Sequence, residues 1–165
     1  MVLIMYKYSK EEINEHRIGR NKHEEETDKL LNSWIEKYFP NIYIINRTDE
    51  WENYDYMIYN QINKYYCKVE CKTRYFTMEQ YNKYSVDGFA LSYDKINYSD
   101  VIIYFIPITN EVLQIRTSKI KELLTSGKIN TTVKQVNRYQ YTNIKDKHDE
   151  TLIVIPKQYW KVWKM

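Results

Sequence analysis

Glycine and proline are scarce in this sequence, with three of each among 165 residues. Such a composition excludes a flexible linker or a long disordered tail, so we expect a single domain that spans residues 1–165. The sequence also lacks an apolar run of membrane-spanning length, and its apolar start, residues 1–6, is too short for a signal peptide. We therefore expect a cytoplasmic protein that does not bind a membrane.

Cysteine is nearly absent as well, with only Cys67 and Cys71 in the chain. Four residues apart on one expected strand, they would be separated by about 13 Å, which is too far for a disulfide. A zinc site would need further Cys or His ligands at suitable spacing, and the sequence offers none. The pattern predicts two buried free thiols in a reducing compartment.

Neither sign of charge dominates, since 25 Lys and Arg against 22 Asp and Glu give a net charge of +3. The excess is uneven, because residues 119–165 hold ten basic and four acidic residues. This stretch is either a solvated surface or one that faces DNA. Eighteen tyrosines, with abundant Asn, Ile and Lys, are typical of an AT-rich genome such as that of a phage or mobile element.

The hydrophobic pattern predicts an α/β protein. Asn21 would cap the first helix together with Glu24, Pro40 would end that helix, and Asp87-Gly88 would form a later turn. We expect helices at 22–38, 78–84 and from 117 or 118 to 125, and strands at 42–47, 55–59, 64–72, 101–106 and 112–116, with a last strand at 151–155. Residues 1–20 and 128–149 give no clear pattern.

Three residues on two neighbouring strands have the chemistry of a phosphodiesterase. Strand alternation places Glu70 and Lys72 on one face, and a hairpin would bring Asp55 beside them. Mg²⁺ or Mn²⁺ prefers one or two carboxylates plus water and substrate oxygens, and the Cys71 carbonyl would add a third protein oxygen. Lys72 would hold the attacking water or the charged phosphate. The alternative is an exposed strand face, since Glu-x-Lys triplets arise by chance.

Over residues 19–106 the sequence resembles the PD-(D/E)xK nuclease superfamily, which includes restriction endonucleases, Holliday-junction resolvases and phage recombination nucleases. The matching residues are Asp55 and Glu70-x-Lys72, while Tyr54 replaces the frequent proline of the motif. The resemblance implies a restriction-endonuclease-like αβββαβ core, a mixed central sheet flanked by helices, here with a C-terminal β-α-β extension. It also implies a Mg²⁺- or Mn²⁺-dependent endonuclease on DNA, possibly branched, and a homodimer.

The same resemblance implies a glutamate on the first helix. Helix geometry favours Glu24 over Glu25 and Glu26, because Glu24 lies nearest the apolar stripe, although it could equally serve the helix cap. His23 beside it is more often a structural residue. Three polar residues after the motif are candidates for substrate binding: Gln80, Lys83 and Lys95.

Two other functions remain open at this stage. One is an RNase or single-strand exonuclease of the same fold. The other is a non-catalytic nucleic-acid-binding or inhibitor protein of a phage or mobile element. An intact set of Asp55, Glu70 and Lys72 argues against the second alternative.

Overall fold

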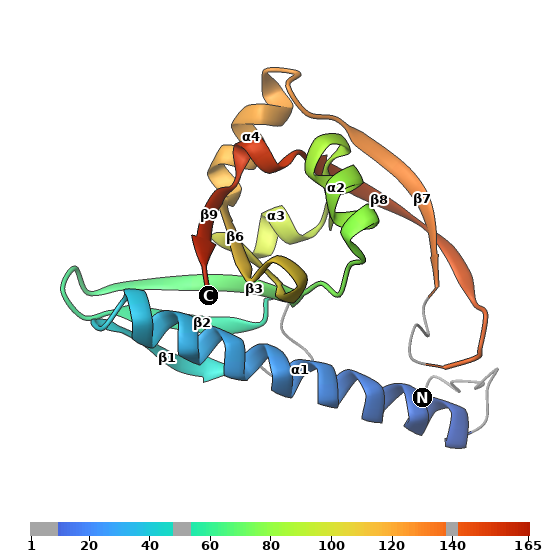
Figure 1. The fold of residues 1–165 in the computed structure, drawn as a ribbon, viewed down its shortest axis with the longest axis horizontal. Coiled ribbons are helices and arrows are strands. Elements are labelled where there is room, and N and C mark those ends of the chain that lie inside the picture. The colour runs from blue at the N-terminus through green and yellow to red at the C-terminus, as the bar shows by residue number, and fades with distance from the viewer. Residues whose placement is uncertain (1–9, 48–53, 138–141) are drawn as a thin grey trace, which may run out of the picture.

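The computed structural model describes residues 10–47, 54–137 and 142–165, so the apolar start of the chain lies outside the described part. A six-stranded sheet in the order β1-β2-β3-β5-β6-β9 forms the centre (Figure 1). Strands β3 and β5 are parallel and the other neighbours are antiparallel. The strands are β1 (Ile42–Arg47), β2 (Tyr56–Asn60), β3 (Tyr65–Thr73), β5 (Val101–Ile106), β6 (Glu111–Arg116) and β9 (Lys161–Lys164). The predicted α/β class with a mixed central sheet is therefore confirmed.

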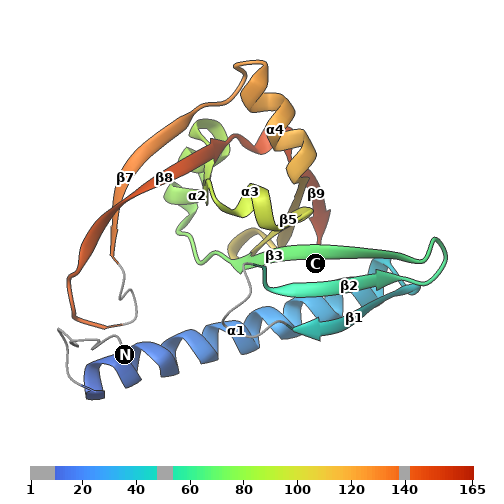
Figure 2. The ribbon, with the colours of Figure 1, turned by 180° about the vertical axis from the view of Figure 1, so that it is seen from behind.

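One face of this sheet is covered by the long helix α1 (Lys10–Tyr38) (Figures 1 and 2). Its apolar stripe of Leu31, Trp34 and Ile35 packs against inward-facing residues of the sheet. The sheet side of this core consists of Tyr56, Val69, Cys71, Ile103, Phe105 and Val112.

The prediction that this helix begins at Lys22 is wrong. Helix α1 starts at Lys10, so Asn21 lies inside the helix and does not cap it. Gly19 and Asn21 are weak helix formers that cost at most about 1 kcal/mol each, and the Lys, Glu and Arg residues around them sustain the helix.

The opposite face carries a second sheet and the remaining helices. The sheet has the order β4-β8-β7, and β7 and β8 form a long, curved hairpin (Figures 1 and 2). Its strands are β4 (Phe89–Ser92), β7 (Thr131–Asn137) and β8 (Lys147–Ile155). The helices are α2 (Met78–Asp87), α3 (Lys95–Tyr98) and α4 (Thr117–Thr125), with short 3₁₀ turns at Pro107–Thr109 and Lys157–Tyr159. The core on this side is built around Tyr104, Ile106, Leu113, Ile120 and Ile155.

The order αβββαβ of the core is present, with β4 and α3 inserted between α2 and β5. The C-terminal extension differs from the predicted β-α-β. The expected last strand at 151–155 is the end of β8, which lies in the second sheet, and β9 follows it to close the edge of the first sheet. Gly88 ends α2 with φ of 120°, and a Cβ there would lie 2.4 Å from the Val154 Cγ1 of β8. Glycine therefore permits the close approach of α2 and β8.

Aromatic side chains join the end of α1 to β9. The Trp163 ring centroid lies 5.7 Å from that of Trp34, 5.1 Å from Tyr38 and 5.2 Å from Phe39. The Tyr38 hydroxyl also donates to the Lys164 carbonyl at 2.6 Å. Residues more than 120 positions apart in sequence thus make one aromatic cluster. Within the described part of the chain, no helix combines the length and the apolar character that crossing a membrane requires.

Candidate active site

The pairing of β2 with β3 places Asp55 across from Glu70. Tyr56 is the register partner of Val69, so the preceding residue, Asp55, faces Glu70. Asp55 lies one residue before β2 rather than within it, but its N–H still donates to the Val69 carbonyl at 3.0 Å. Its Oδ2 accepts a hydrogen bond from the N–H of Cys71 at 2.9 Å. These two bonds fix the Asp55 carboxylate against the backbone of β3.

Along β3, successive side chains point alternately into the hydrophobic core and toward the candidate active site. Val69 and Cys71 point into the core under α1, and Cys67 packs at its border. Both cysteines are free thiols, as the sequence predicts, but only Cys71 is buried as expected, since Cys67 is partly exposed at the border of the core. Glu70 and Lys72 therefore point to the opposite face, toward α3 and the second core.

Glu70 is fully buried and carries two lysines on one oxygen. Its Oε1 lies 3.1 Å from the Lys72 Nζ and 3.3 Å from the Lys95 Nζ. Both lysine side chains keep about a third of their surface exposed, at 36% and 29%. Within the described part of the chain neither oxygen of Glu70 has a hydrogen-bond partner, and Oε2 has no ion pair either. A buried carboxylate oxygen without a hydrogen-bond partner is costly unless a water molecule or an ion completes its bonding.

The electrostatics of the site follow from this burial. Burial raises the pKa of Glu70 above its usual range; the Lys72 ammonium opposes this rise and the nearby Asp55 carboxylate adds to it. Burial alone would lower the pKa of Lys72, but the carboxylates of Glu70 and Asp55 outweigh it and raise that pKa. Lys72 is therefore a fixed positive charge at neutral pH, beside two carboxylates that repel one another.

Helix α1 touches this end of β3 through small polar residues. The hydroxyl oxygens of Thr27 and Thr73 are 2.7 Å apart in a buried contact. One turn earlier, His23 is partly buried, and burial, with the nearby Lys72 charge, lowers its pKa. Glu24 is half-buried and lies 3.7 Å from the guanidinium of Arg20 on the same helix.

Two residues near the site escaped the sequence analysis. The Tyr56 hydroxyl donates to the carboxylate of Asp28, an acidic residue one helical turn after Glu24. Arg74, the first residue after β3, places its guanidinium 5.0 Å from the Tyr104 ring centroid. The helical spacing from Glu24 would have indicated Asp28, and the position of Arg74 directly after the strand that carries Glu70 and Lys72 would have indicated the arginine.

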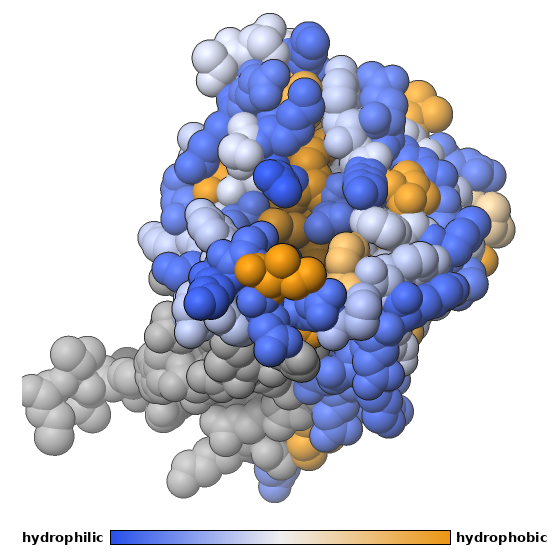
Figure 3. Space-filling model, turned by 90° about the vertical axis from the view of Figure 1, so that its left-hand side faces the viewer, coloured by the Kyte–Doolittle hydropathy of each residue, from blue (hydrophilic) through white to orange (hydrophobic). Residues whose placement is uncertain are grey.

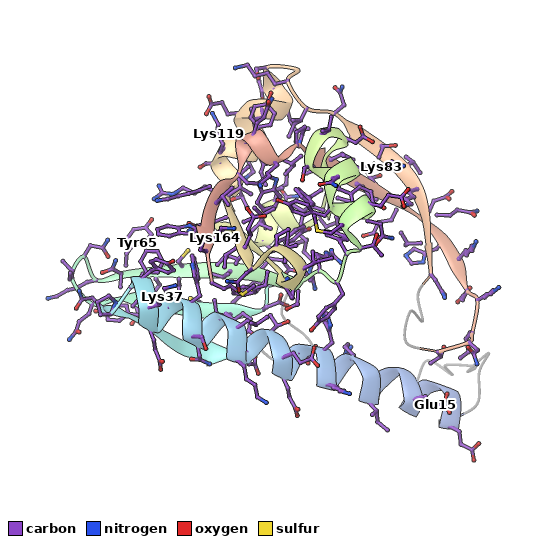
Figure 4. All side chains as sticks on the ribbon, viewed as in Figure 1. Glu15, Lys37, Tyr65, Lys83, Lys119 and Lys164 are labelled. Atoms are coloured by element: carbon purple, nitrogen blue, oxygen red, sulfur yellow. The ribbon has the colours of Figure 1, made fainter. Side chains whose placement is uncertain are left out.

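The three predicted substrate-binding residues are placed differently. Lys95, at the start of α3, reaches Glu70 directly. Gln80 forms a capping box, since its side chain accepts from the Thr77 N–H and its own N–H donates to the Thr77 hydroxyl. Lys83 is exposed on α2 (Figure 4). Only Lys95 is thus brought into contact with the carboxylates.

The donor set suits a hard divalent cation that keeps most of its water. Residues 10–47, 54–137 and 142–165 contain no group of three or more His, Cys, Asp or Glu arranged to hold a metal ion. Two carboxylates, Asp55 and Glu70, do converge, and the oxygens of Glu70 have no hydrogen-bond partner in these described ranges. Mg²⁺ is commonly bound by one or two carboxylates with water and substrate phosphate completing its shell. The site thus fits such an ion, whereas a structural zinc site would need four protein ligands.

No known family model matches this sequence. No match is found among curated proteins either. Among solved structures, the chain is similar to D212, described as a nuclease from a fusselovirus, with a TM-score of 0.46 and 20% sequence identity. The similarity covers 81% of this chain and 79% of that chain.

Proposed function

We propose that this protein is a metal-dependent nuclease that hydrolyses phosphodiester bonds in DNA. The observation that carries the proposal is the convergence of Asp55, Glu70 and Lys72 on one face of the β2–β3 pair, with Glu70 buried and its carboxylate oxygens without a hydrogen-bond partner among the described residues. A surface strand with chance charges would leave all three solvated. Burial of a carboxylate beside another carboxylate is costly, and it is typical of sites where charge has a function.

Asp55 and Glu70, with the main-chain carbonyl of Cys71, would hold Mg²⁺ or Mn²⁺. Such an ion would polarise the scissile phosphate and lower the pKa of a bound water. The Cys71 N–H bond to Asp55 fixes one carboxylate, and burial fixes the other, so both are preorganised. Burial and, after it, the charge of Asp55 raise the pKa of Glu70, and a bound cation would stabilise the charged form of this carboxylate.

Lys72 would act on the phosphate and the attacking water. Its raised pKa keeps it an ammonium, so it donates hydrogen bonds and serves as a charge rather than as a base. Pairing with Glu70 at 3.1 Å fixes its position before substrate arrives. Lys95 would move from Glu70 to a substrate phosphate when a cation takes over the neutralisation of the carboxylate.

The remaining roles follow from the same site. Glu24 would support the site from α1. Gln80 and Lys83 on α2 would contact DNA farther from the cut. Because nearly all of the chain builds the two sheets and their helices, we further propose a structure-specific endonuclease that acts on branched DNA as a homodimer in the cytoplasm. Paired cuts on a two-fold symmetric junction require two such sites.

A direct assay tests the proposal. Purified protein is incubated with supercoiled plasmid, a four-way junction, single-stranded DNA and RNA, each with Mg²⁺, Mn²⁺ or EDTA. We expect cleavage of DNA with either ion and none in EDTA, with loss of cleavage in Asp55→Ala and Glu70→Ala. Glu122→Gln, an exposed glutamate on α4, is the matched control and should cleave normally. Cleavage of RNA alone would favour the RNase alternative, and binding without cleavage would favour a non-catalytic protein.

A further inference from the structure

The β2–β3 hairpin continues beyond the catalytic residues as a two-stranded ribbon. Tyr59 pairs with Tyr66, and Met57 pairs with Lys68. Since side chains alternate along a strand, Tyr66 and Lys68 lie on the same face as Glu70, four and two residues earlier in the strand. One face of the ribbon thus leads from the carboxylates to a lysine and then to a pair of tyrosines.

The two tyrosines form an exposed aromatic surface. Their ring centroids are 4.8 Å apart with an interplanar angle of 40°. Tyr66 keeps 58% of its surface exposed, and Tyr59 is partly exposed. This end of the molecule faces the viewer in Figure 3, where the surface is largely hydrophilic. An aromatic pair left open in polar surroundings can accept the face of another ring.

The opposite face of the same ribbon accounts for its stability. Ile58 and Cys67, which are register partners, pack against the core under α1. The hairpin is therefore anchored from that side without help from the tyrosines. A cross-strand aromatic pair would add only about 0.2–1 kcal/mol to such an anchored hairpin. A purely structural role leaves the exposure of the two rings unexplained.

Lys68 connects the aromatic pair to the candidate active site. It is exposed, and its Nζ lies 5.3 Å from the ring centroid of Tyr54, the residue before Asp55. At 3.3 Å per residue, Tyr66 is about 13 Å from Glu70 along the strand. That span corresponds to about four nucleotides of a strand stacked as in duplex DNA, at 3.4 Å each, and to fewer nucleotides of an extended single strand. A DNA strand that is cut beside Glu70 would therefore pass Lys68 and reach the two tyrosines within a few nucleotides.

We infer that Tyr59 and Tyr66 form a stacking platform for unpaired nucleobases of the substrate, with Lys68 binding the intervening phosphates. Stacking accepts any base, because each base has a π face, so the platform would select for single-stranded character rather than for sequence. This inference rests on the proposed function. It specifies the substrate as DNA with an unpaired arm next to the scissile phosphate.

Binding measured in EDTA separates this inference from catalysis. The probes are a fluorescein-labelled fork, which has a duplex and an unpaired arm, and a blunt duplex of equal length. We expect wild type to bind the fork more tightly. Combined Tyr59→Ala and Tyr66→Ala substitution should weaken fork binding by roughly 5- to 150-fold, the range for one lost stacked base, with duplex binding unchanged. The Phe substitutions at both positions keep the rings and should preserve fork binding.

The neighbouring Tyr65 supplies a matched control. It is exposed to 69% on the same strand but lies on the other ribbon face, near the hairpin turn (Figure 4), so Tyr65→Ala should bind the fork normally. If the double variant does not fold, Tyr66→Ala alone is used. In wild type, 2-aminopurine in the unpaired arm should lose fluorescence on binding as it stacks.

Several outcomes overturn the inference. They are unchanged fork affinity in the folded Ala variants, equal losses for fork and duplex, and no change in 2-aminopurine fluorescence. If one of these outcomes is found while wild type still shows metal-dependent cleavage, the stacking role of Tyr59 and Tyr66 is refuted and the proposed nuclease function is retained. If the platform effects appear but wild type never cleaves, the nuclease proposal fails and a binding protein remains. Absence of any nucleic-acid binding by wild type overturns both.

Discussion

Two buried glutamates in the same sheet, Glu70 and Glu111, differ in how their carboxylate oxygens are bonded. Glu111, at the start of β6, has both oxygens satisfied: Tyr81 donates its hydroxyl to Oε1, and the Lys157 Nζ lies 3.0 Å from Oε2. Glu70 has both lysines on Oε1, and within the described residues Oε2 accepts no hydrogen bond. Each glutamate is buried on a strand and paired with lysine, so burial and pairing alone do not distinguish them.

The pKa shifts of the two carboxyls have opposite signs. Burial tends to raise the pKa of Glu111, but hydrogen bonds from Tyr81, Thr109 and Lys157 outweigh it, and that pKa is lowered. For Glu70, burial and the neighbouring Asp55 charge prevail over the lysines, and the pKa is raised. The comparison teaches that a carboxylate with complete hydrogen bonding stabilises the fold, whereas one kept incomplete beside a second carboxylate is suited to an incoming cation.

Exchanging each glutamate for glutamine should separate the two roles most strongly. Glu70→Gln keeps the shape but removes a charge that would bind the metal, so we expect the cleavage rate to fall by about 10²–10³-fold or more. Its unfolding free energy should change by about 1 kcal/mol or less, because a charge that the fold disfavours is removed. Glu111→Gln should cleave at the wild-type rate. Initial cleavage rates and urea unfolding are measured for both variants. Equal cleavage rates for Glu70→Gln and Glu111→Gln would refute the assignment of a catalytic role to Glu70 and a structural role to Glu111.

The lysine partners should show the same division on a smaller scale. Lys72→Ala removes one preorganised contact to the transition state, so the rate should fall on the order of 10²-fold with DNA binding largely kept. Lys157→Ala, the equivalent change beside Glu111, should leave the rate unaltered. Single-turnover rates at saturating protein distinguish chemistry from binding. A rate loss in Lys157→Ala, with the protein folded, would show that the Glu111 cluster is not merely structural.

Stability against pH tests the Glu111 side of the comparison. Glu111→Gln should lower the free energy of unfolding at pH 7 by about 1–3 kcal/mol, because Tyr81 and Lys157 lose a charged partner. Since the folded pKa of Glu111 is lowered, its contribution is present above the usual glutamate pKa and is lost as the pH falls through the folded value. The difference between wild type and variant should therefore shrink in acid. Urea unfolding at a series of pH values measures it, and a pH-independent difference would contradict the assignment.

Lys95 offers the finest test, since it is the second cation on Glu70. Its Nζ lies 3.3 Å from Oε1, so it competes with a metal ion for the same carboxylate. Lys95 is 29% exposed, so solvent screens part of its repulsion of a bound cation. Removing that repulsion in Lys95→Met should therefore raise the Mn²⁺ affinity by only about tenfold. Calorimetry measures this without any cleavage. Lys83→Met, on the exposed side of α2, is the control, and unchanged affinity in Lys95→Met would exclude competition.

The grouping of Asp55, Glu70 and Lys72 could be predicted because it depends on local geometry. Period-2 alternation along one strand and a short hairpin turn suffice to place these residues, even though Asp55 lies just outside β2. The contact between Lys95 and Glu70 depends on where α3 docks, 25 positions along the chain, and local pattern does not contain that information. The same holds for Asp28, whose partner Tyr56 is set by how α1 crosses β2.

The missed elements share physical causes. β4, α3 and β9 have four residues each, which is too short for a periodic signal. Most of β7 is exposed on both faces, so its sequence shows no apolar alternation. The sequence did not indicate Glu111 either, because Tyr81 and Lys157, which contact its two oxygens, come from α2 and from the 3₁₀ turn before β9. Features that arise from packing between distant segments were thus invisible in the sequence.

The aromatic cluster of Trp34, Tyr38, Phe39 and Trp163 has a consequence for the order of folding. It joins the end of α1 to β9 across almost the whole chain, so the loop that must close is long and its formation is slow. During synthesis, the apolar stripe of α1 can pack first on β2, β3, β5 and β6, whereas its contacts with Trp163 must await a strand made more than 100 residues later. The aromatic contacts that hold the C-terminal end of α1 are therefore complete only after β9 has emerged, so the final position of the helix beside the candidate active site depends on the last strand of the fold.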